Sequence, residues 1–270
     1  MTKIENSTIL VTGAAGGLGK LMAKKCLMRG AKQAVLWDIN ETALNETTAE
    51  LERLGYKVLP YVVDVTKIED IEWAAKDVLK ETSGVDIIFN NAGIVVGKSF
   101  VEHTDKDLKM TIDINVLGVM RVTKAFLGNM LVREKGHVVN IASAAGLVPN
   151  PNMTVYASSK WAVVGWSESL RLELESLESS IKVLTVTPSY INTGMFDGVK
   201  APMLTPIMEP NDIVNRILKA VEQDEIILRA PFIVKTVPFL RGVLPTRMFD
   251  FVADKLGVYS SMDDFKGKDE

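Results

Sequence analysis

The sequence predicts one α/β domain over residues 1–270, built on a doubly wound parallel sheet with helices on both faces. Short apolar runs alternate with longer amphipathic stretches, which is the alternation of strands and helices. The apolar runs are rich in Val, Ile and Leu and contain few polar residues, as in strands that are covered on both sides. Repeated β-α-β units favour a parallel sheet with right-handed crossovers.

The first strand is predicted at residues 7–12, and a helix at 17–29 follows it across a glycine-rich turn. The same alternation predicts further strands at residues 33–38, 57–64, 85–91, 136–143, 181–188 and 225–228, and helices at 41–54, 67–82, 104–135 and 155–177. The region 104–135 is expected to be mainly helical.

Two segments depart from this alternation. Residues 189–210 form a long connection rich in Gly, Pro and Met after a strand that ends at Pro188. Ligands of doubly wound folds bind at the carboxyl ends of strands, and long loops are commonly functional, so we predict a substrate loop here. In the extension at 229–270, prolines recur every seven residues at 231, 238 and 245 and allow only short helical pieces. Its part at 229–258 mixes Phe with Lys and Arg, and we favour a lipophilic pocket or plain packing over contact with a membrane.

Composition excludes several classes of protein. Lys and Arg number 31 against 34 Asp and Glu, and this balance argues against nucleic-acid binding. A single cysteine, Cys26, excludes an intramolecular disulfide, and with only two histidines a metal site is not expected. We find neither a signal peptide nor an uninterrupted apolar run long enough for a membrane span, so a cytoplasmic location is expected.

A glycine-rich turn joins the first strand to the first helix. It reads Gly13-x-x-x-Gly17-Leu18-Gly19 within residues 12–19. Glycine lacks the Cβ that would hold a pyrophosphate away from the backbone, and a helix N-terminus offers free N–H groups and partial positive charge. The turn is therefore expected to bind the phosphates of a dinucleotide.

Two acidic residues follow at strand ends. Asp38 ends the second strand, where a carboxylate can accept both ribose hydroxyls and repel a 2′-phosphate. Because no nearby residue offers a cation and Lys20 is expected to point to solvent, the sequence favours NAD over NADP. Asp38 could instead cap the next helix. Asp64 ends the third strand and is either an adenine contact or a turn residue.

A tyrosine and a lysine share one helix face. Tyr156 and Lys160 are four residues apart, so both side chains lie on the same side of the helix. A nearby cation stabilises phenolate and lowers the tyrosine pKa from its ordinary value of about 10, which would let Tyr156 act as a general acid or base. Ser143 follows a strand at the same sheet edge as Gly13 and could hydrogen-bond a substrate oxygen, or simply cap a turn.

Taken together, these motifs resemble the classical short-chain dehydrogenase/reductase family. The resemblance covers residues 5–230 and rests on the glycine turn, Asn90-Asn91-Ala92-Gly93, Asn115, Ser143, Tyr156-x-x-x-Lys160 and Pro188-x-x-x-x-Thr193. It implies a Rossmann-type domain in which Tyr156 is the acid/base, Ser143 binds the substrate oxygen, and Lys160 holds the nicotinamide ribose and lowers the tyrosine pKa. It also implies that Asn115 anchors a water of a proton relay, Thr193 meets the nicotinamide carboxamide, and Asn91, Ala92, Gly93 and Pro188 lie beside the cofactor. Ser189 stands where the family usually has Gly.

Other segments are similar to the retinol dehydrogenase and 17β-hydroxysteroid dehydrogenase branch. They are residues 36–40, 142–146, 191–196 and 206–210. The implied activity is NAD-dependent hydride transfer between nicotinamide and a lipophilic alcohol or ketone, such as a retinoid, steroid or long-chain alcohol. A homodimer or homotetramer is expected. The N-terminal hydrophobic anchor common in that branch is not apparent, so membrane residence is not favoured.

Two other functions fit the same fold. One is a non-catalytic NAD-binding regulator, which would not need Asn115, Ser143, Tyr156 and Lys160 together. The other is a sugar-nucleotide epimerase, which shares the Tyr/Lys pair but usually has a larger C-terminal substrate domain. We therefore favour the dehydrogenase.

Overall fold

A computed structural model describes residues 1–267 and contains one parallel sheet. Its strands are β1 (Thr8–Thr12), β2 (Gln33–Asp38), β3 (Val58–Val62), β4 (Ile87–Asn90), β5 (His137–Ile141), β6 (Lys182–Pro188) and β7 (Ile227–Ala230). They lie in the order β3-β2-β1-β4-β5-β6-β7, and every neighbouring pair is parallel. The chain reverses its direction of travel across the sheet between β1 and β4, which is where a doubly wound fold binds its ligand.

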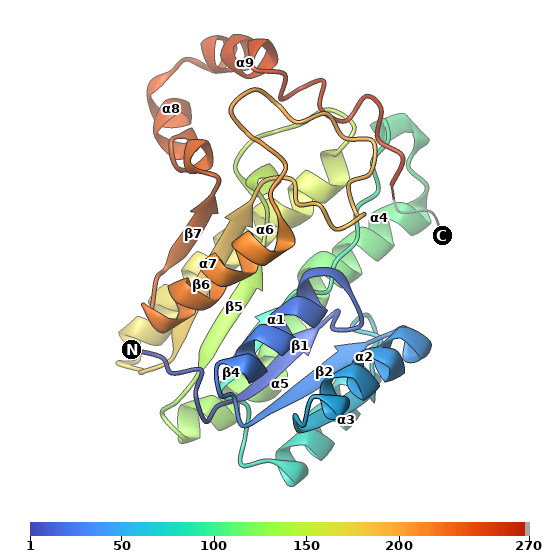
Figure 1. The fold of residues 1–270 in the computed structure, drawn as a ribbon. Coiled ribbons are helices and arrows are strands. Elements are labelled where there is room, and N and C mark those ends of the chain that lie inside the picture. The colour runs from blue at the N-terminus through green and yellow to red at the C-terminus, as the bar shows by residue number, and fades with distance from the viewer. Residues whose placement is uncertain (268–270) are drawn as a thin grey trace.

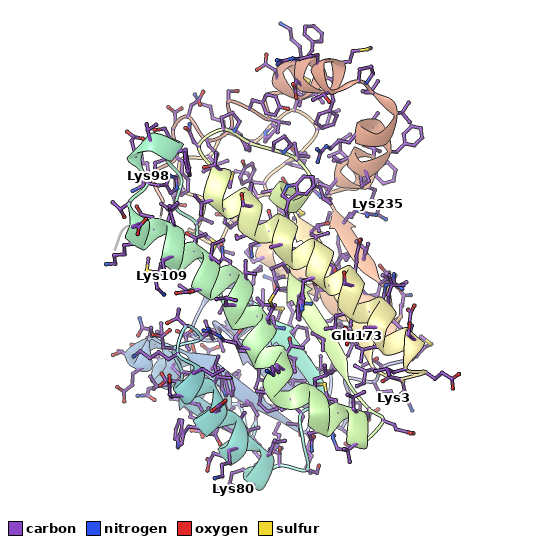
Figure 2. The ribbon with its side chains drawn as sticks, turned by 180° about the vertical axis from the view of Figure 1, so that it is seen from behind. Lys3, Lys80, Lys98, Lys109, Glu173 and Lys235 are labelled. Carbon is purple, nitrogen blue, oxygen red and sulfur yellow. The ribbon has the colours of Figure 1, made fainter. Side chains whose placement is uncertain are left out.

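Helices cover both faces of this sheet, as the sequence predicted (Figures 1 and 2). One face is covered by α1 (Gly17–Met28), α2 (Glu41–Arg53) and α7 (Pro210–Glu222), and the other by α3 (Ile68–Glu81), α5 (Val119–Val132) and α6 (Thr154–Ser176). Alternate residues of β1 divide between the two cores, since Ile9 and Val11 belong to one and Leu10 to the other. The strands read as continuous apolar runs because both of their faces are buried.

Three elements differ from the sequence prediction. The region at 104–135 is divided into α4 (Asp105–Ile112), a π-helical segment (Asp113–Gly118) and α5. The helix α7 was not predicted, although its buried residues Ile213, Val214, Ile217 and Val221 follow helical spacing and Pro210 stands in its first turn. The strand β7 lies two residues later than expected.

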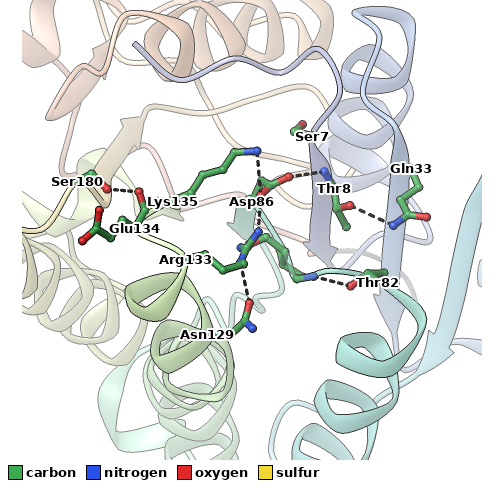
Figure 3. Close-up of polar contacts among 12 residues, drawn as sticks. Ser7, Thr8, Gln33, Thr82, Asp86, Asn129, Arg133, Glu134, Lys135 and Ser180 are labelled. Atoms are coloured by element: carbon green, nitrogen blue, oxygen red, sulfur yellow. Dashed lines mark hydrogen bonds and ion pairs between the residues drawn. The ribbon is translucent and has the colours of Figure 1, made fainter.

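A polar cluster joins elements at the edge of the sheet where the strands begin (Figure 3). Asp86, just before β4, accepts a hydrogen bond from the Thr8 N–H of β1 (2.9 Å). The same carboxylate pairs with Arg133 (2.8 Å) and Lys135 (3.2 Å), which follow α5. These contacts fix the starts of β1 and β4 relative to each other, and leave the carboxyl ends of the strands for the site.

The C-terminal extension folds over the carboxyl edge of the sheet (Figure 1). It contains the short helices α8 (Val237–Val243) and α9 (Thr246–Lys255), as the spaced prolines predicted. Beyond α9 the chain returns to the loop at 189–210, where the Met203 N–H donates to the Leu256 carbonyl and the Lys200 N–H to the Ser261 carbonyl. Backbone hydrogen bonds therefore join the loop at 189–210 to the C-terminal extension. The last three residues of the extension lie outside the described residues.

Candidate active site

The glycine turn requires glycine for two reasons, its backbone conformation and its close packing. Gly13 and Gly17 have φ of +66° and +51°, in the left-handed region that favours glycine. A Cβ at Gly19 would lie 2.0 Å from the Gly13 carbonyl oxygen. The turn thus brings bare backbone to the N-terminus of α1, which is a cradle suited to a pyrophosphate. Gly19 itself is buried beneath this cradle, so it shapes the turn and does not line the cleft.

Asn91 and Thr12 join the ends of β4 and β1 beneath the cleft. The Asn91 side-chain amide donates to the carbonyls of Thr12 (2.9 Å) and Gly13 (3.2 Å). The Thr12 hydroxyl accepts from the N–H groups of Asn91 and Ala92, both at 3.0 Å. These bonds place Asn91, Ala92 and Gly93 along one wall, as predicted.

Asp38 lies at the end of β2 beside the glycine turn. Its carboxylate accepts from the Ala15 N–H (2.8 Å) and from the Asn40 N–H (2.9 Å). The alternative of a helix cap is not seen, because the Asn40 side chain caps α2. Lys20 pairs with Glu50 at 2.7 Å and is half-buried, rather than pointing freely to solvent. The position of Asp38 and the pairing of Lys20 with Glu50 leave a negative group where a ribose would lie. This arrangement fits NAD and disfavours a 2′-phosphate.

The structure favours the turn interpretation of Asp64. Its side chain accepts from the Thr66 N–H (2.9 Å) and hydroxyl (2.7 Å), and it does not line the cleft. The predicted contact with the adenine, through the side chain or the neighbouring backbone, stays a prediction.

Tyr156, Lys160 and Ser143 meet at the other end of the cleft. Tyr156 and Lys160 lie in the first two turns of α6, and both are buried. The Lys160 ammonium donates to the Ile141 carbonyl at the end of β5 (2.9 Å) and lies 5.6 Å from the centre of the Tyr156 ring. Ser143 follows β5, and its hydroxyl accepts from the Ala145 N–H (3.1 Å). Ser143 therefore caps a turn and also lines the cleft, and its bond to a substrate oxygen stays a prediction.

The protonation of the pair differs from the prediction. Burial raises the pKa of Tyr156 above its ordinary value, and a hydrogen bond with the Ser143 hydroxyl opposes this shift only in part. Burial also lowers the pKa of Lys160 to about 8. The predicted lowering of the Tyr156 pKa by Lys160 is not observed, because burial disfavours the charged form of each group.

Asn115 supports the site from behind the cleft. It lies fully buried in the π-helical segment, and its side-chain amide donates to the Ile94 carbonyl and to the Ser159 hydroxyl, both at 3.0 Å. Its side-chain oxygen accepts from the Ile94 N–H (2.9 Å). Asn115 thus joins the wall at 93–94 to α6, three residues from Tyr156. Both hydrogens of the Asn115 amide are already used in these bonds. The relay water predicted at Asn115 would therefore have to donate to an acceptor, and could not accept from this amide.

The loop after β6 closes the cleft. Pro188 ends β6, and the Ser189 N–H donates to the Ala230 carbonyl, so serine is accommodated in place of the usual glycine. Thr193 lies against the glycine turn, since a Cβ on Gly17 would be 3.9 Å from the Thr193 Cβ. Apart from Gly19, Asp64 and Asn115, all predicted site residues line this one cleft: Gly13, Gly17, Leu18, Asp38, Asn91, Ala92, Gly93, Ser143, Tyr156, Lys160, Pro188 and Thr193.

Comparison with known proteins identifies the family. Residues 7–203 match the short chain dehydrogenase family. The chain belongs to this family. It is 36% identical to epidermal retinol dehydrogenase 2 of Mus musculus over 98% of this chain and 87% of that protein. It is also 36% identical to estradiol 17-beta-dehydrogenase 11 of Homo sapiens, over 94% of this chain and 85% of the relative.

Solved structures of short-chain dehydrogenases have the same fold. A short chain dehydrogenase/reductase from Burkholderia phymatum in complex with NAD superposes with a TM-score of 0.80 at 25% identity, covering 94% of this chain and 97% of that one. An NAD+-bound xylitol dehydrogenase gives 0.76 at 25% identity, over 85% and 99% of the two chains. Together with the glycine cradle and Asp38, these matches make this short-chain dehydrogenase an NAD-dependent oxidoreductase acting on CH–OH groups.

A second cavity joins the dinucleotide cleft of this short-chain dehydrogenase. It shares Ser143, Ser189 and Phe196 with the cleft. Its walls come from residues 143–153 after β5, from the loop at 189–210 and from the extension. Most of the lining residues are apolar: Val148, Met153, Pro202, Met203, Ile233, Val234, Val237, Leu240, Phe249, Val252, Ala253, Leu256 and Val258. The predicted substrate loop therefore forms one wall, although its Leu204 and Met208 line neither space.

Two residues beside Tyr156 were not predicted. Met153 and Met262 are buried in one cluster with the tyrosine. Met262 comes from the far end of the chain, and no short-range pattern could have placed it there. Phe196 packs edge-on against Tyr156 at 6.2 Å and against Tyr190 at 5.2 Å between ring centres. The segment at 191–196 therefore places an aromatic ring directly against Tyr156.

Proposed function

We propose that this dehydrogenase interconverts a long or polycyclic lipophilic alcohol and its carbonyl form, using NAD. The observation that carries the proposal is the apolar lining of the cavity that meets the cleft at Ser143. A cavity lined mostly by apolar side chains suits an organic molecule with a large apolar body. The names of the relatives, a retinol dehydrogenase and an estradiol 17-beta-dehydrogenase, support the same class.

In the proposed mechanism the protein positions the substrate oxygen and moves one proton. The Ser143 hydroxyl donates to the substrate oxygen where the cavity meets the cleft. Bound NAD supplies the hydride acceptor for an alcohol, or in its reduced form the donor for a carbonyl. Tyr156 stays protonated near neutral pH, because burial raises its pKa, and is thus ready to protonate a carbonyl oxygen.

The reverse direction needs phenolate. The Lys160 ammonium, 5.6 Å from the ring centre, is the cation available to stabilise it. Lys160 also lines the cleft, where it would hold the nicotinamide ribose. The convergence of Ser143, Tyr156 and Lys160 on one cleft favours an enzyme over a pure NAD-binding regulator.

A homologous series of primary alcohols tests the substrate class. Each methylene that enters the cavity should improve kcat/KM by up to about 0.8 kcal/mol, roughly fourfold, until the cavity is full. The measurement is NADH formation at fixed NAD. A kcat/KM that stays flat with chain length, or better turnover of a sugar such as xylitol, would contradict the lipophilic assignment.

A single substitution tests the reacting residue. Tyr156→Phe removes the transferable proton and keeps the ring contact with Phe196, so it should lower turnover by about 10²-fold or more while the dissociation constant for NAD stays unchanged. NADH fluorescence and steady-state kinetics measure both quantities. Near-normal turnover by this variant would show that another group transfers the proton.

We also propose that the protein works in the cytoplasm as a homodimer or homotetramer. Exposed apolar side chains on α5 and α6, including Val132, Trp161 and Leu172, support a subunit contact. Light scattering coupled to size exclusion should give a mass of two or four chains. A monomeric mass at micromolar concentration would contradict this assembly.

A further inference from the structure

The helices α8 and α9 have two apolar faces with different surroundings. Their inner face lines the cavity through residues such as Leu240, Phe249 and Val252. Their outer face leaves Phe239 69%, Val243 63%, Met248 55% and Phe251 64% exposed. Phe232, which precedes α8, is 76% exposed. We call Phe232, Phe239, Val243, Met248 and Phe251 the outer apolar face.

The helices carrying this face stand clear of the sheet at one end of the molecule (Figures 1 and 2). Monomeric soluble proteins seldom expose large apolar side chains in such a group unless they bind something there. Packing of the extension itself does not explain the outer apolar face, because Phe249 and Ala253 already bury the inner side of α9.

Charge around this face has the opposite sign to that of the whole chain. Residues 229–256 contain five basic residues, Arg229, Lys235, Arg241, Arg247 and Lys255, against the two acids Asp250 and Asp254, whereas the chain carries a net charge of −3. The Arg247 side chain is 96% exposed and lies 3.8 Å from the Asp250 carboxylate. Lys235 is labelled near α8 in Figure 2. A basic fringe around exposed aromatics complements an anionic surface.

The mouth of the cavity opens beside this face. Met203 and Val252 line the cavity and are also 63% and 38% exposed, so they mark its rim. Leu204, next to Met203, is 64% exposed. A lipophilic compound dissolved in a bilayer would thus meet the cavity without crossing water.

We propose that the outer apolar face, with Lys235, Arg247 and Lys255, docks the enzyme peripherally on an anionic lipid surface. Aromatic side chains would enter the headgroup boundary and the basic side chains would meet anionic headgroups. A second copy of this chain fits less well, because a two-fold contact would place the two basic fringes against each other. The inference goes beyond the proposed function, since docking does not require that the substrate be lipophilic.

Vesicle flotation of the full chain without substrate tests the proposal. The protein should float with phosphatidylcholine vesicles that contain phosphatidylserine and at least tenfold less with phosphatidylcholine alone. Phe239→Ser/Phe251→Ser and Lys235→Glu/Arg247→Glu should each weaken binding at least tenfold, and high salt should weaken it as well. Neither pair lines the cleft or the cavity, so turnover of a short, water-soluble alcohol should be unchanged.

Met28→Ser/Trp73→Ser is the matched control. These side chains are 65% and 59% exposed, close to Phe239 and Phe251, but they lie on α1 and α3. This variant should bind vesicles like the unmodified protein. Equal losses of vesicle binding in Phe239→Ser/Phe251→Ser and in the control Met28→Ser/Trp73→Ser, or no flotation with anionic vesicles, would overturn the proposal. Concentration-dependent dimerisation that Phe239→Ser/Phe251→Ser abolishes, without vesicle binding, would overturn it in favour of a second copy.

Discussion

Asp38 controls the choice of dinucleotide through one carboxylate. Its oxygens already accept from the N–H groups of Ala15 and Asn40, which hold it beside the glycine turn. NAD should therefore bind more tightly than NADP by at least about tenfold, or ~1.4 kcal/mol, because a 2′-phosphate would face this carboxylate. Asp38→Ala should narrow the gap, as measured by dissociation constants from NADH and NADPH fluorescence.

Asp64→Ala is the control for this prediction. Asp64 is the other acid that follows a strand, but its side chain caps a turn with Thr66 and stays out of the cleft. Its replacement should leave the ratio of the two dissociation constants unchanged. Tighter binding of NADP by the unmodified protein would refute the assignment of Asp38.

At the residue scale, sequence spacing predicted positions better than it predicted electrostatics. The four-residue spacing of Tyr156 and Lys160 placed both on one helix face, and strand ends placed Gly13 and Ser143 at one sheet edge. The direction of the Tyr156 pKa shift was predicted wrongly, because it depends on burial by groups such as Met262 from the far end of the chain. Such contacts have no signature in local sequence.

At the element scale, Arg241 holds α8 to the catalytic helix. Its guanidinium lies 4.6 Å from the centre of the Trp161 ring, next to Lys160 in α6, and donates to the Leu147 carbonyl (2.7 Å). Arg241→Gln should loosen the wall of the cavity and lower kcat/KM for long alcohols by about tenfold, from the combined loss of a cation–π contact and a charged hydrogen bond. Most of the change should appear in KM.

The same kinetic series contains the controls for Arg241. Short alcohols that do not reach α8 should keep their kcat/KM, and Arg241→Lys, which retains the charge but not the planar fork, should lie between the two. Equal losses for short and long alcohols would mean that Arg241 acts on the fold as a whole and not on the cavity wall.

Strands with continuous apolar runs were predictable, whereas local departures from regular geometry were not. The strands β1, β2 and β6 lie close to their predicted bounds because both faces of each are buried, which makes the apolar run continuous. The π-helical segment at Asp113–Gly118 looks like ordinary helix in sequence, and only the buried contacts of Asn115 with Ile94 and Ser159 reveal its role. The helix α7 was overlooked beside a long loop.

At the scale of the whole molecule, one histidine couples folding to pH. His137, at the start of β5, is fully buried, and burial lowers its pKa to about 4, although Asp224 opposes the shift. The Thr2 hydroxyl donates to Asp224 (2.7 Å), and the His137 Nδ1 lies 2.9 Å from the same hydroxyl oxygen. The Nδ1–H must therefore donate to Thr2. With a pKa of about 4, the ring is neutral near neutral pH. Among residues 1–267, its Nε2 has no partner that could stabilise the charged ring.

This coupling predicts a loss of stability in acid. The unfolded chain binds a proton at His137 near pH 6.5, and the folded chain binds it only near pH 4. The contribution is fully present above pH 6.5 and is lost as the pH falls towards 4, by about 3 kcal/mol in the free energy of unfolding. Urea denaturation of the unmodified protein and of His137→Gln at each pH should show a shallower decline in the variant. The His103 ring lies beside the Ser99 carbonyl and the Phe100 ring, away from Asp224, so His103→Gln should retain the full decline. If His137→Gln declines as steeply as the unmodified protein, carboxylates alone set the acid limit of this fold.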